Sequence, residues 1–404
     1  MKITEVKSRE ILDSRGWPTV ETDITIEGNI TGRASVPSGA STGSNEALEL
    51  RDNEKRYLGK GVLKAVNNVN TIIKENIINK DFKNFQELDE LLIKLDNTKN
   101  KTNLGANAIL SVSLAYIKAC AQKENKELYK YIGEKKQVPK CMFNILNGGM
   151  HADNKIEFQE FMIMVNRKTV KEQLQIASEV FHNLKNILKE QGYSTNVGDE
   201  GGFAPNLKNN EEALDTIIKA IEISGYKPKE DVLIALDIAA SSFYDKNKKM
   251  YLIDNTYKNT DQMIEMYKEL IKKYPIFSIE DPLEEQDFIG FSKLTDELDT
   301  NIVGDDLYTT NKNLLQKGIE NKSTNFILLK ANQIGTISEM LDTIKLAREN
   351  NINMIISHRS GETEDTFISD FAVGLGIPYM KSGSLSRGER ICKYNRLLRI
   401  EENL

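Results

Sequence analysis

The amino-acid sequence predicts an α/β protein, in which a C-terminal eight-stranded α/β barrel of the TIM type, opening with an antiparallel strand, follows a smaller N-terminal α+β domain. The first part of the chain alternates apolar and polar residues and then becomes helical. From about residue 136 onward, short apolar runs recur, and most are followed by a helical stretch. A doubly wound open sheet is the alternative, but the sequence has neither a G-x-G-x-x-G fingerprint nor a Walker-type loop.

The N-terminal domain is expected at residues 1–135. VETDITIEG (Val20–Gly28) alternates apolar and polar side chains, which is typical of a half-buried strand, and Gly28 begins a turn to another short strand. From Gly61 onward the pattern is helical, most clearly in Gly105–Gln122. The stretch Gln137–Pro139 has the character of a domain boundary, so we expect the barrel at 136–404.

The predicted barrel rests on strand-helix repetition over about 250 residues, a length that suits eight strands. CMFNILN (Cys141–Asn147) and the following FMIMV run are separated only by a loop, so we expect them to form an antiparallel hairpin. Counting Thr195–Val197 gives nine candidate strands, one too many, and the IPYMK run is a possible appended segment. The later runs are VLIALD, IFSIED, NIVGDD, FILLK, NMIISH and IPYMK.

Composition limits the function classes. The 404 residues are 39% hydrophobic and 28% charged, as in a folded globular protein, and the net charge of −6 argues against a nucleic-acid or anionic-membrane partner. The start MKITEVKSRE lacks the apolar core of a secretory signal. The three cysteines are too far apart in sequence for a disulfide framework or a zinc pattern. We therefore expect a cytoplasmic protein.

Ionisable residues end six of the predicted buried strands, and this pattern indicates a site. One such residue is usually a helix cap, but six indicate the carboxyl rim of one barrel, where barrel enzymes keep their active sites. Three carboxylates from adjacent strands would repel unless a cation held them, and oxygen ligands select Mg²⁺ or Mn²⁺. A structural salt-bridge network with Lys330 is the alternative. The six residues are Asp237, Glu280, Asp305, Lys330, His358 and Lys381.

Further residues complete a predicted reaction site. A divalent cation beside Lys330 would lower the pKa of that lysine, which would suit it to act as a general base. Arg359 and Ser360 of HRSG offer a guanidinium and a hydroxyl for a phosphate, unless Arg359 only forms an ion pair. PSGASTG (Pro37–Gly43) would serve as a lid. In NVGDEGGFAP, Glu200 is a candidate acid, although the stretch alone favours a surface turn.

Such groups suit removal of a proton next to a carboxylate, followed by loss of a leaving group. Taken together, the motifs closely resemble the enolase family, the glycolytic phosphopyruvate hydratases (2-phospho-D-glycerate hydro-lyases). The matching stretches run nearly end to end: EILDSRG, VPSGASTG, ELRD, RYLGKGV, LGANAIL, NGGMHADN, QEFMIM, NVGDEGGFAP, ALDIAAS, SIEDPL, VGDDLYTTN, LLKANQIGT, SHRSGETEDTF, KSGSLSRGER and LLRIEENL.

The resemblance implies reversible dehydration of 2-phosphoglycerate to phosphoenolpyruvate through an enediolate. Catalysis would belong to Lys330 as base and Glu200 as acid, and a Lys base with one or two Mg²⁺ ions is a general feature of this superfamily. Two Mg²⁺ ions are implied, the second arriving with substrate. The implied metal ligands are Asp237, Glu280, Asp305 and Ser41, and the implied substrate-binding residues are His151, Gln159, Glu160, His358, Arg359, Ser360 and Lys381.

The resemblance further implies a homodimer or an octamer of dimers, with a moonlighting surface or scaffold role as the alternative function. Three departures from the usual family residues are Trp17, Met150 and Ser242. None of them removes a residue implied in catalysis. Met150 precedes His151 on an expected lid loop, where it could alter substrate affinity or lid closure.

Overall fold

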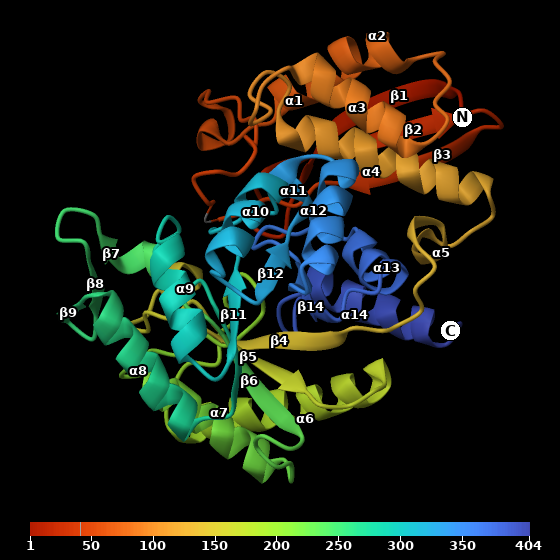
Figure 1. Cartoon of the computed structure of the whole chain (residues 1–404). Helices are drawn as coiled ribbons and strands as arrows, with labels where there is room; N and C mark the ends of the chain where they lie inside the picture. The colour runs from red at the N-terminus through yellow and green to blue at the C-terminus, as the bar shows by residue number, and fades with distance from the viewer. Residues whose placement is uncertain (41) are drawn as a thin grey trace.

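The computed structural model describes residues 1–40 and 42–404, which form an N-terminal α+β domain and a C-terminal closed barrel (Figure 1). In the N-terminal domain, β1, β2 and β3 form one antiparallel sheet in that order. Its strands are β1 (Ile3–Leu12), β2 (Pro18–Ile26) and β3 (Ile30–Ser35), and its α-helices are α1 (Leu63–Asn68), α2 (Lys74–Ile77), α3 (Phe85–Asp96), α4 (Ala106–Lys123) and α5 (Leu128–Ile132).

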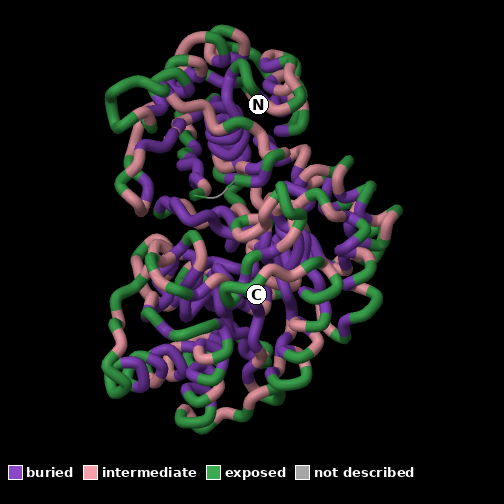
Figure 2. The backbone as a smooth tube through the Cα atoms, turned by 90° about the vertical axis from the view of Figure 1, so that its left-hand side faces the viewer, coloured by how far each residue is buried: buried purple, intermediate pink, exposed green. Residues whose placement is uncertain are grey.

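Helix α4 packs directly on this sheet, and its sequence explains why. Nearly every residue of α4 is buried, because small and apolar side chains occupy all of its faces. The closest approach is at Gly32 of β3, where an added Cβ would lie 2.1 Å from the carbonyl oxygen of Ala115. Only glycine allows the two backbones to come this close. The buried segments run through the middle of both domains (Figure 2).

The second domain is the predicted eight-stranded barrel. Strand β5 is antiparallel to both of its neighbours, β4 and β6, and all other neighbouring pairs are parallel. The expected antiparallel hairpin is thus confirmed. In their order around the barrel, the strands are β10 (Ile276–Glu280), β11 (Asn301–Gly304), β12 (Phe326–Leu329), β13 (Asn353–Ser357), β14 (Tyr379–Lys381), β4 (Lys140–Asn147), β5 (Glu160–Val165) and β6 (Val232–Asp237).

The structure resolves the surplus of candidate strands. The IPYMK run is no appendage, because Tyr379–Lys381 pairs with both β13 and β4 and closes the barrel. The run at Thr195–Val197 is the one outside the barrel. There, Val197 forms only an isolated bridge to Phe203. The sequence also did not indicate the small antiparallel sheet of β7 (Tyr244–Asp245), β8 (Met250–Ile253) and β9 (Thr256–Lys258).

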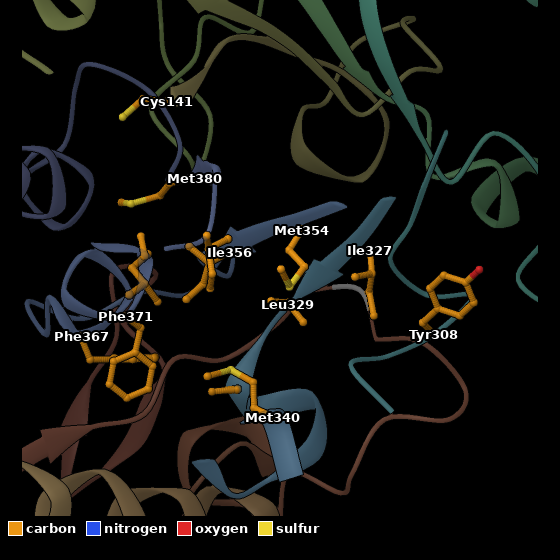
Figure 3. Packing of buried hydrophobic residues seen from close by; sticks show 14 of the residues in the cluster. Cys141, Tyr308, Ile327, Leu329, Met340, Met354, Ile356, Phe367, Phe371 and Met380 are labelled. Carbon is orange, nitrogen blue, oxygen red and sulfur yellow. The ribbon is translucent and has the colours of Figure 1, made fainter. Parts of the chain in front are cut away.

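Helices surround the barrel and cover its apolar strands. Figure 3 shows part of this core, in which Met340 of α12 and Phe371 of α13 lie beside residues of β12 and β13 such as Leu329 and Ile356. The helices are α6 (Val170–Glu190), α7 (Asn210–Ile223), α8 (Thr260–Lys273), α9 (Phe288–Glu297), α10 (Lys312–Asn321), α11 (Ala331–Ile334), α12 (Ile337–Glu349), α13 (Phe367–Gly374) and α14 (Gly388–Glu401). No helix of residues 1–40 and 42–404 is long and apolar enough to cross a membrane.

The two domains are joined by polar contacts at the start of α12, which lies next to the N-terminal domain (Figure 1). Asp89 of α3 accepts the backbone N–H and the hydroxyl of Ser338, at 2.9 and 2.6 Å. Lys101 forms an ion pair with Glu339 at 2.6 Å. These contacts hold the N-terminal domain, with its predicted lid, against the carboxyl rim of the barrel.

Asp89 gives this junction a measurable pH dependence. Burial raises its pKa from 3.8 to about 6, so the folded state holds the proton more tightly than the unfolded chain. Its contribution to stability is therefore fully present below pH 3.8 and is lost as pH rises through 6. We expect the free energy of unfolding of the wild type, measured with urea, to fall between pH 5 and 7.5 by about 1.4 kcal/mol more than that of Asp89→Asn. Parallel pH profiles for the two proteins would contradict this assignment.

Candidate active site

The predicted polar residues meet at the carboxyl rim of the barrel. Asp237, Glu280 and Lys381 are the last residues of β6, β10 and β14, and Asp305, Lys330 and His358 directly follow β11, β12 and β13. A cavity of about 290 Å³ opens at this rim. The predicted residues that line it are His151, Gln159, Glu160, Glu200, Asp237, Asp305, Lys330, His358, Arg359, Ser360 and Lys381. Glu280 does not line the cavity but contacts Lys381, which does. Ser41 falls outside the described residues.

Lys381 is the cationic centre of the carboxylate cluster. Its Nζ lies 3.0 Å from Asp237, 2.9 Å from both oxygens of Glu280 and 3.2 Å from Glu160. All four side chains are buried, where a charge is stable only when it is paired. Burial opposes the charge of Lys381, but these carboxylates hold its pKa well above the ordinary value. Burial and the charge of Asp237 raise the pKa of Glu280.

Lys330 and Asp305 form a second ion pair, in which Asp305 is buried and Lys330 is half-buried. Lys330 Nζ donates to Asp305 Oδ2 at 2.5 Å, and the amide of Gln333 donates to Asp305 Oδ1 at 2.9 Å. Among the protein groups alone, the pKa of Lys330 is raised, because the attraction of Asp305 outweighs the effect of burial. The lowered pKa expected from the sequence includes the charge of a bound divalent cation, and it stays a prediction. The pKa of Asp305 is lowered: burial opposes its ionisation, but the charge of Lys330 favours it.

The cluster has the donor chemistry of a hard-cation site. Asp237, Glu280 and Asp305 come from adjacent strands, since β10 pairs with both β6 and β11. They offer only oxygen ligands, which suit Mg²⁺ or a similar ion. Close by, Gln159 Oε1 and Glu160 Oε2 are buried and have no hydrogen-bond partner among the described residues. The residues present therefore fit a divalent metal.

Two other groups among the described residues bring ligand atoms within 4.8 Å of one another, namely Asp281, Asp305, Asp306 and His151, Glu160, Glu200. The predicted trio is not among these groups, and lysine ammonium groups contact all three of its members. In the first group, Asp281 is already engaged, because its oxygens accept the backbone N–H groups of Asp305 and Asp306 at 2.9 and 2.8 Å. Burial, followed by the charge of Asp305, raises the pKa of Asp306 to about 8.

Glu200 is buried in the site and does not lie in a surface turn. Its glycine neighbours explain the position: an added Cβ at Gly201 would lie 2.5 Å from the carbonyl oxygen of Ser386, and one at Gly202 would lie 2.5 Å from Asn147 Oδ1. The loop can therefore press against its surroundings and turn Glu200 inward. There the carboxylate accepts a hydrogen bond from Asn144 at 2.9 Å.

Glu200 and Glu160 lie close enough to affect each other's ionisation. Burial and the charge of Glu200 raise the pKa of Glu160 well above its ordinary value. Burial also opposes ionisation of Glu200, but the neighbouring imidazoles of His151 and His358, followed by Arg390 and Lys381, outweigh it and lower its pKa. Two buried carboxyl groups this close disfavour each other's ionisation, and the opposite shifts make Glu160 the more basic of the two.

The predicted phosphate-binding residues contact the predicted lid and the segment that follows it. Arg359 donates to both carboxylate oxygens of Glu46, at 2.9 and 3.0 Å, and Ser360 Oγ accepts the backbone N–H of Ala40 at 2.6 Å. Glu46 also accepts from Gln333 at 3.2 Å. The sequence analysis missed Glu46 and Gln333. Gln333 lies inside the motif LLKANQIGT, and Glu46 lies shortly after VPSGASTG, but neither residue ends a strand.

The mouth of the cavity carries two of the residues noted as departures. Met150 is 64% exposed and precedes the buried His151 in a short 3₁₀ turn (Gly149–His151). Ser242, in the 3₁₀ helix Ala240–Phe243, lines the cavity as well. Both therefore lie where a bound molecule would enter. Trp17, in contrast, is not part of the cavity lining. Its ring centre lies 4.9 Å from the ammonium nitrogen of Lys60.

Comparison with known families agrees with this architecture. Residues 3–132 match the family model described as "Enolase, N-terminal domain", and residues 135–404 match the one described as "Enolase, C-terminal TIM barrel domain". The two matches cover both domains of the structure and the whole of the candidate site.

Proposed function

The chain belongs to the enolase family, and from this premise we propose that it catalyses the reversible, Mg²⁺-dependent dehydration of 2-phosphoglycerate to phosphoenolpyruvate. The observation that supports this most strongly is one cavity lined by two lysines, by a pair of carboxyl groups that affect each other's ionisation, and by oxygen donors that suit a hard cation. Such a reaction belongs to glycolysis and gluconeogenesis.

In this proposal, Lys330 removes the proton from C2 of the substrate. The amine must be neutral to do so, whereas Asp305 favours its charged form. Bound Mg²⁺ would oppose the negative charge that develops on the substrate carboxylate and, through Asp305, weaken the field that raises the pKa of Lys330. Asp237, Glu280 and Asp305 would hold the first ion, and Ser41 would contribute to the second.

The second half of the reaction breaks the bond between C3 and its hydroxyl. Glu200 delivers a proton to that oxygen, which leaves as water while the C2–C3 double bond forms. The proton is drawn from the pair that Glu200 makes with Glu160, because burial and the charge of Glu200 make Glu160 bind a proton more tightly than an ordinary carboxyl group does. His151 and Gln159 line the cavity around this pair.

Cationic groups around the cavity would bind the two ends of the substrate. Arg359 and Ser360 are proposed to hold the phosphate, and their contacts with Glu46 and Ala40 would couple phosphate binding to the lid segment. Lys381 now pairs with Asp237 and Glu280. It would face the substrate carboxylate once a bound cation neutralised part of the charge of these two carboxylates. The phosphate-binding pair distinguishes this proposal from proton abstraction on an unphosphorylated acid.

A direct assay tests the proposal. Purified protein with 2-phosphoglycerate and Mg²⁺ is expected to show rising ultraviolet absorbance as phosphoenolpyruvate forms. EDTA should stop the rise, and excess Mg²⁺ should restore it, because the ion would supply positive charge that stabilises the developing enediolate. If no phosphoenolpyruvate appears at any Mg²⁺ concentration, the proposed activity is wrong.

A further inference from the structure

Arg390, in the first turn of α14, connects two parts of the candidate site. It is fully buried, and its guanidinium donates to the backbone carbonyls of Arg359 and Ser360, both at 2.6 Å, and to that of Asp199 at 3.1 Å. The first two acceptors follow β13, and the third directly precedes Glu200. It also contacts two side chains: Nη1 lies 2.5 Å from Nδ1 of His358, and Nε lies 3.3 Å from a carboxylate oxygen of Glu389.

The chemistry of the contact between Arg390 and His358 restricts His358. A guanidinium stays charged and can only donate hydrogen bonds, so Nδ1 must offer its lone pair. The ring proton of a neutral His358 must then be on Nε2. A proton on Nδ1, in the other tautomer or in the imidazolium, would place two N–H donors against each other at 2.5 Å. The other ring nitrogen, Nε2, lies 3.5 Å from Glu200 Oε2.

We propose that Arg390 is a positioning residue that fixes His358 as the neutral tautomer with its proton on Nε2, directed at Glu200. The environment agrees with this assignment. Burial lowers the pKa of His358 well below its ordinary value, and the charge of Arg390 adds to the effect of burial. The approach of Arg390 also depends on Gly383, where an added Cβ would lie 2.8 Å from Cδ of Arg390.

The inference deepens the proposed function and, in its catalytic consequence, rests on it. A neutral His358 with Nε2–H can donate a hydrogen bond to Glu200 but cannot act as the acid, because only the imidazolium form of histidine gives up a proton readily. Proton delivery to the leaving hydroxyl is thereby left to the Glu160–Glu200 pair. Arg390 thus selects the acid without touching substrate.

The tautomer can be read directly by nitrogen NMR on the full-length protein. The chain has only three histidines, so ¹⁵N-histidine labelling gives three ring systems, and His151→Gln and His182→Gln assign the one that belongs to His358. In wild type, we expect His358 to show an unprotonated Nδ1 and a protonated Nε2, unchanged from pH 6 to 8. A protonated Nδ1 in wild type would overturn the proposal, whatever the activity of the protein.

Arg390→Met tests the cause of this state, with Lys393→Met as the matched control. Lys393 is also buried on α14, but it pairs with Glu362 at 2.8 Å and forms no hydrogen bond with His358. We expect only Arg390→Met to bring the two ¹⁵N shifts of His358 toward a tautomer average. We also expect it to slow dehydration roughly 10- to 100-fold more than exchange of the C2 hydrogen with solvent. Unchanged His358 signals in Arg390→Met, or equal changes in both variants, would overturn the proposal.

The NMR result does not depend on turnover of 2-phosphoglycerate. A protein with the expected tautomer but without phosphoenolpyruvate formation would leave Arg390 as a positioning residue and refute the proposed function. A protein that forms phosphoenolpyruvate but has a protonated Nδ1 on His358 would support the proposed function and refute the role of Arg390.

Discussion

Replacing Lys330 with alanine is expected to abolish exchange of the C2 hydrogen of 2-phosphoglycerate with solvent. Lys330 directly follows β12, is half-buried at the rim and lines the cavity, and in the proposed reaction it is the amine that takes this proton. Because proton abstraction precedes every later step, dehydration should fall with exchange, by about 10³-fold or more. Incubating the protein with substrate and Mg²⁺ in D₂O and following deuterium at C2 by mass spectrometry measures the exchange.

Loss of a buried cation could also disturb the fold, so the comparison needs a control. Lys345→Ala removes an exposed lysine on α12 that makes only a 4.0 Å contact with Glu349, and it should exchange like wild type. Lys330→Ala also leaves Asp305 without its partner, so circular dichroism and Mg²⁺ binding should be measured on the same sample. Exchange at the wild-type rate in folded Lys330→Ala would show that another group is the base.

Replacing Glu200 with glutamine should separate the two halves of the reaction. Glutamine has nearly the same size and can still accept the hydrogen bond from Asn144, but it cannot deliver a proton to the leaving hydroxyl. We therefore expect exchange at C2 to stay within about tenfold of wild type, while formation of phosphoenolpyruvate falls about 10²- to 10⁴-fold. Both rates can be followed on one preparation by mass spectrometry and ultraviolet absorbance.

Glu190→Gln, an exposed substitution at the end of α6, is the matched control and should leave both rates unchanged. The decisive quantity is the ratio of exchange to dehydration. If Glu200→Gln slows both rates equally, then Glu200 contributes to proton abstraction or to the fold and is not specifically the acid. If both rates persist, the proton must come from elsewhere in the site.

The rim of the barrel could be predicted from the sequence because it depends on local regularities. Buried strands are apolar, parallel strands end at one edge, and so residues such as Asp237 and Lys330 that follow apolar runs come together. The same reasoning was less secure for short strands. Tyr379–Lys381 is only three residues long and was a doubtful member of the barrel, although its pairing with β13 and β4 is what closes it.

Contacts between residues far apart in sequence could not be predicted in this way. Glu200 looks like part of a surface turn until the loop around Ser386 is known to cover its glycines. Glu46 and Arg390 bind the loop after β13 from the N-terminal domain and from the last helix, and no periodicity in the chain indicates either contact. The charge state of Lys330 likewise depends on the distance to Asp305, which follows a different strand.

A crystal structure with 2-phosphoglycerate and Mg²⁺ bound would test the central claim most directly. The account predicts one ion held by Asp237, Glu280 and Asp305, with Lys381 displaced from Glu280 toward the substrate carboxylate and Lys330 Nζ facing C2. The carboxylate contacts that Lys381 now makes, at 2.9 to 3.2 Å, give the reference for that displacement. An ion seated instead among Asp281, Asp305 and Asp306, or a substrate whose C2 lies away from Lys330, would contradict it.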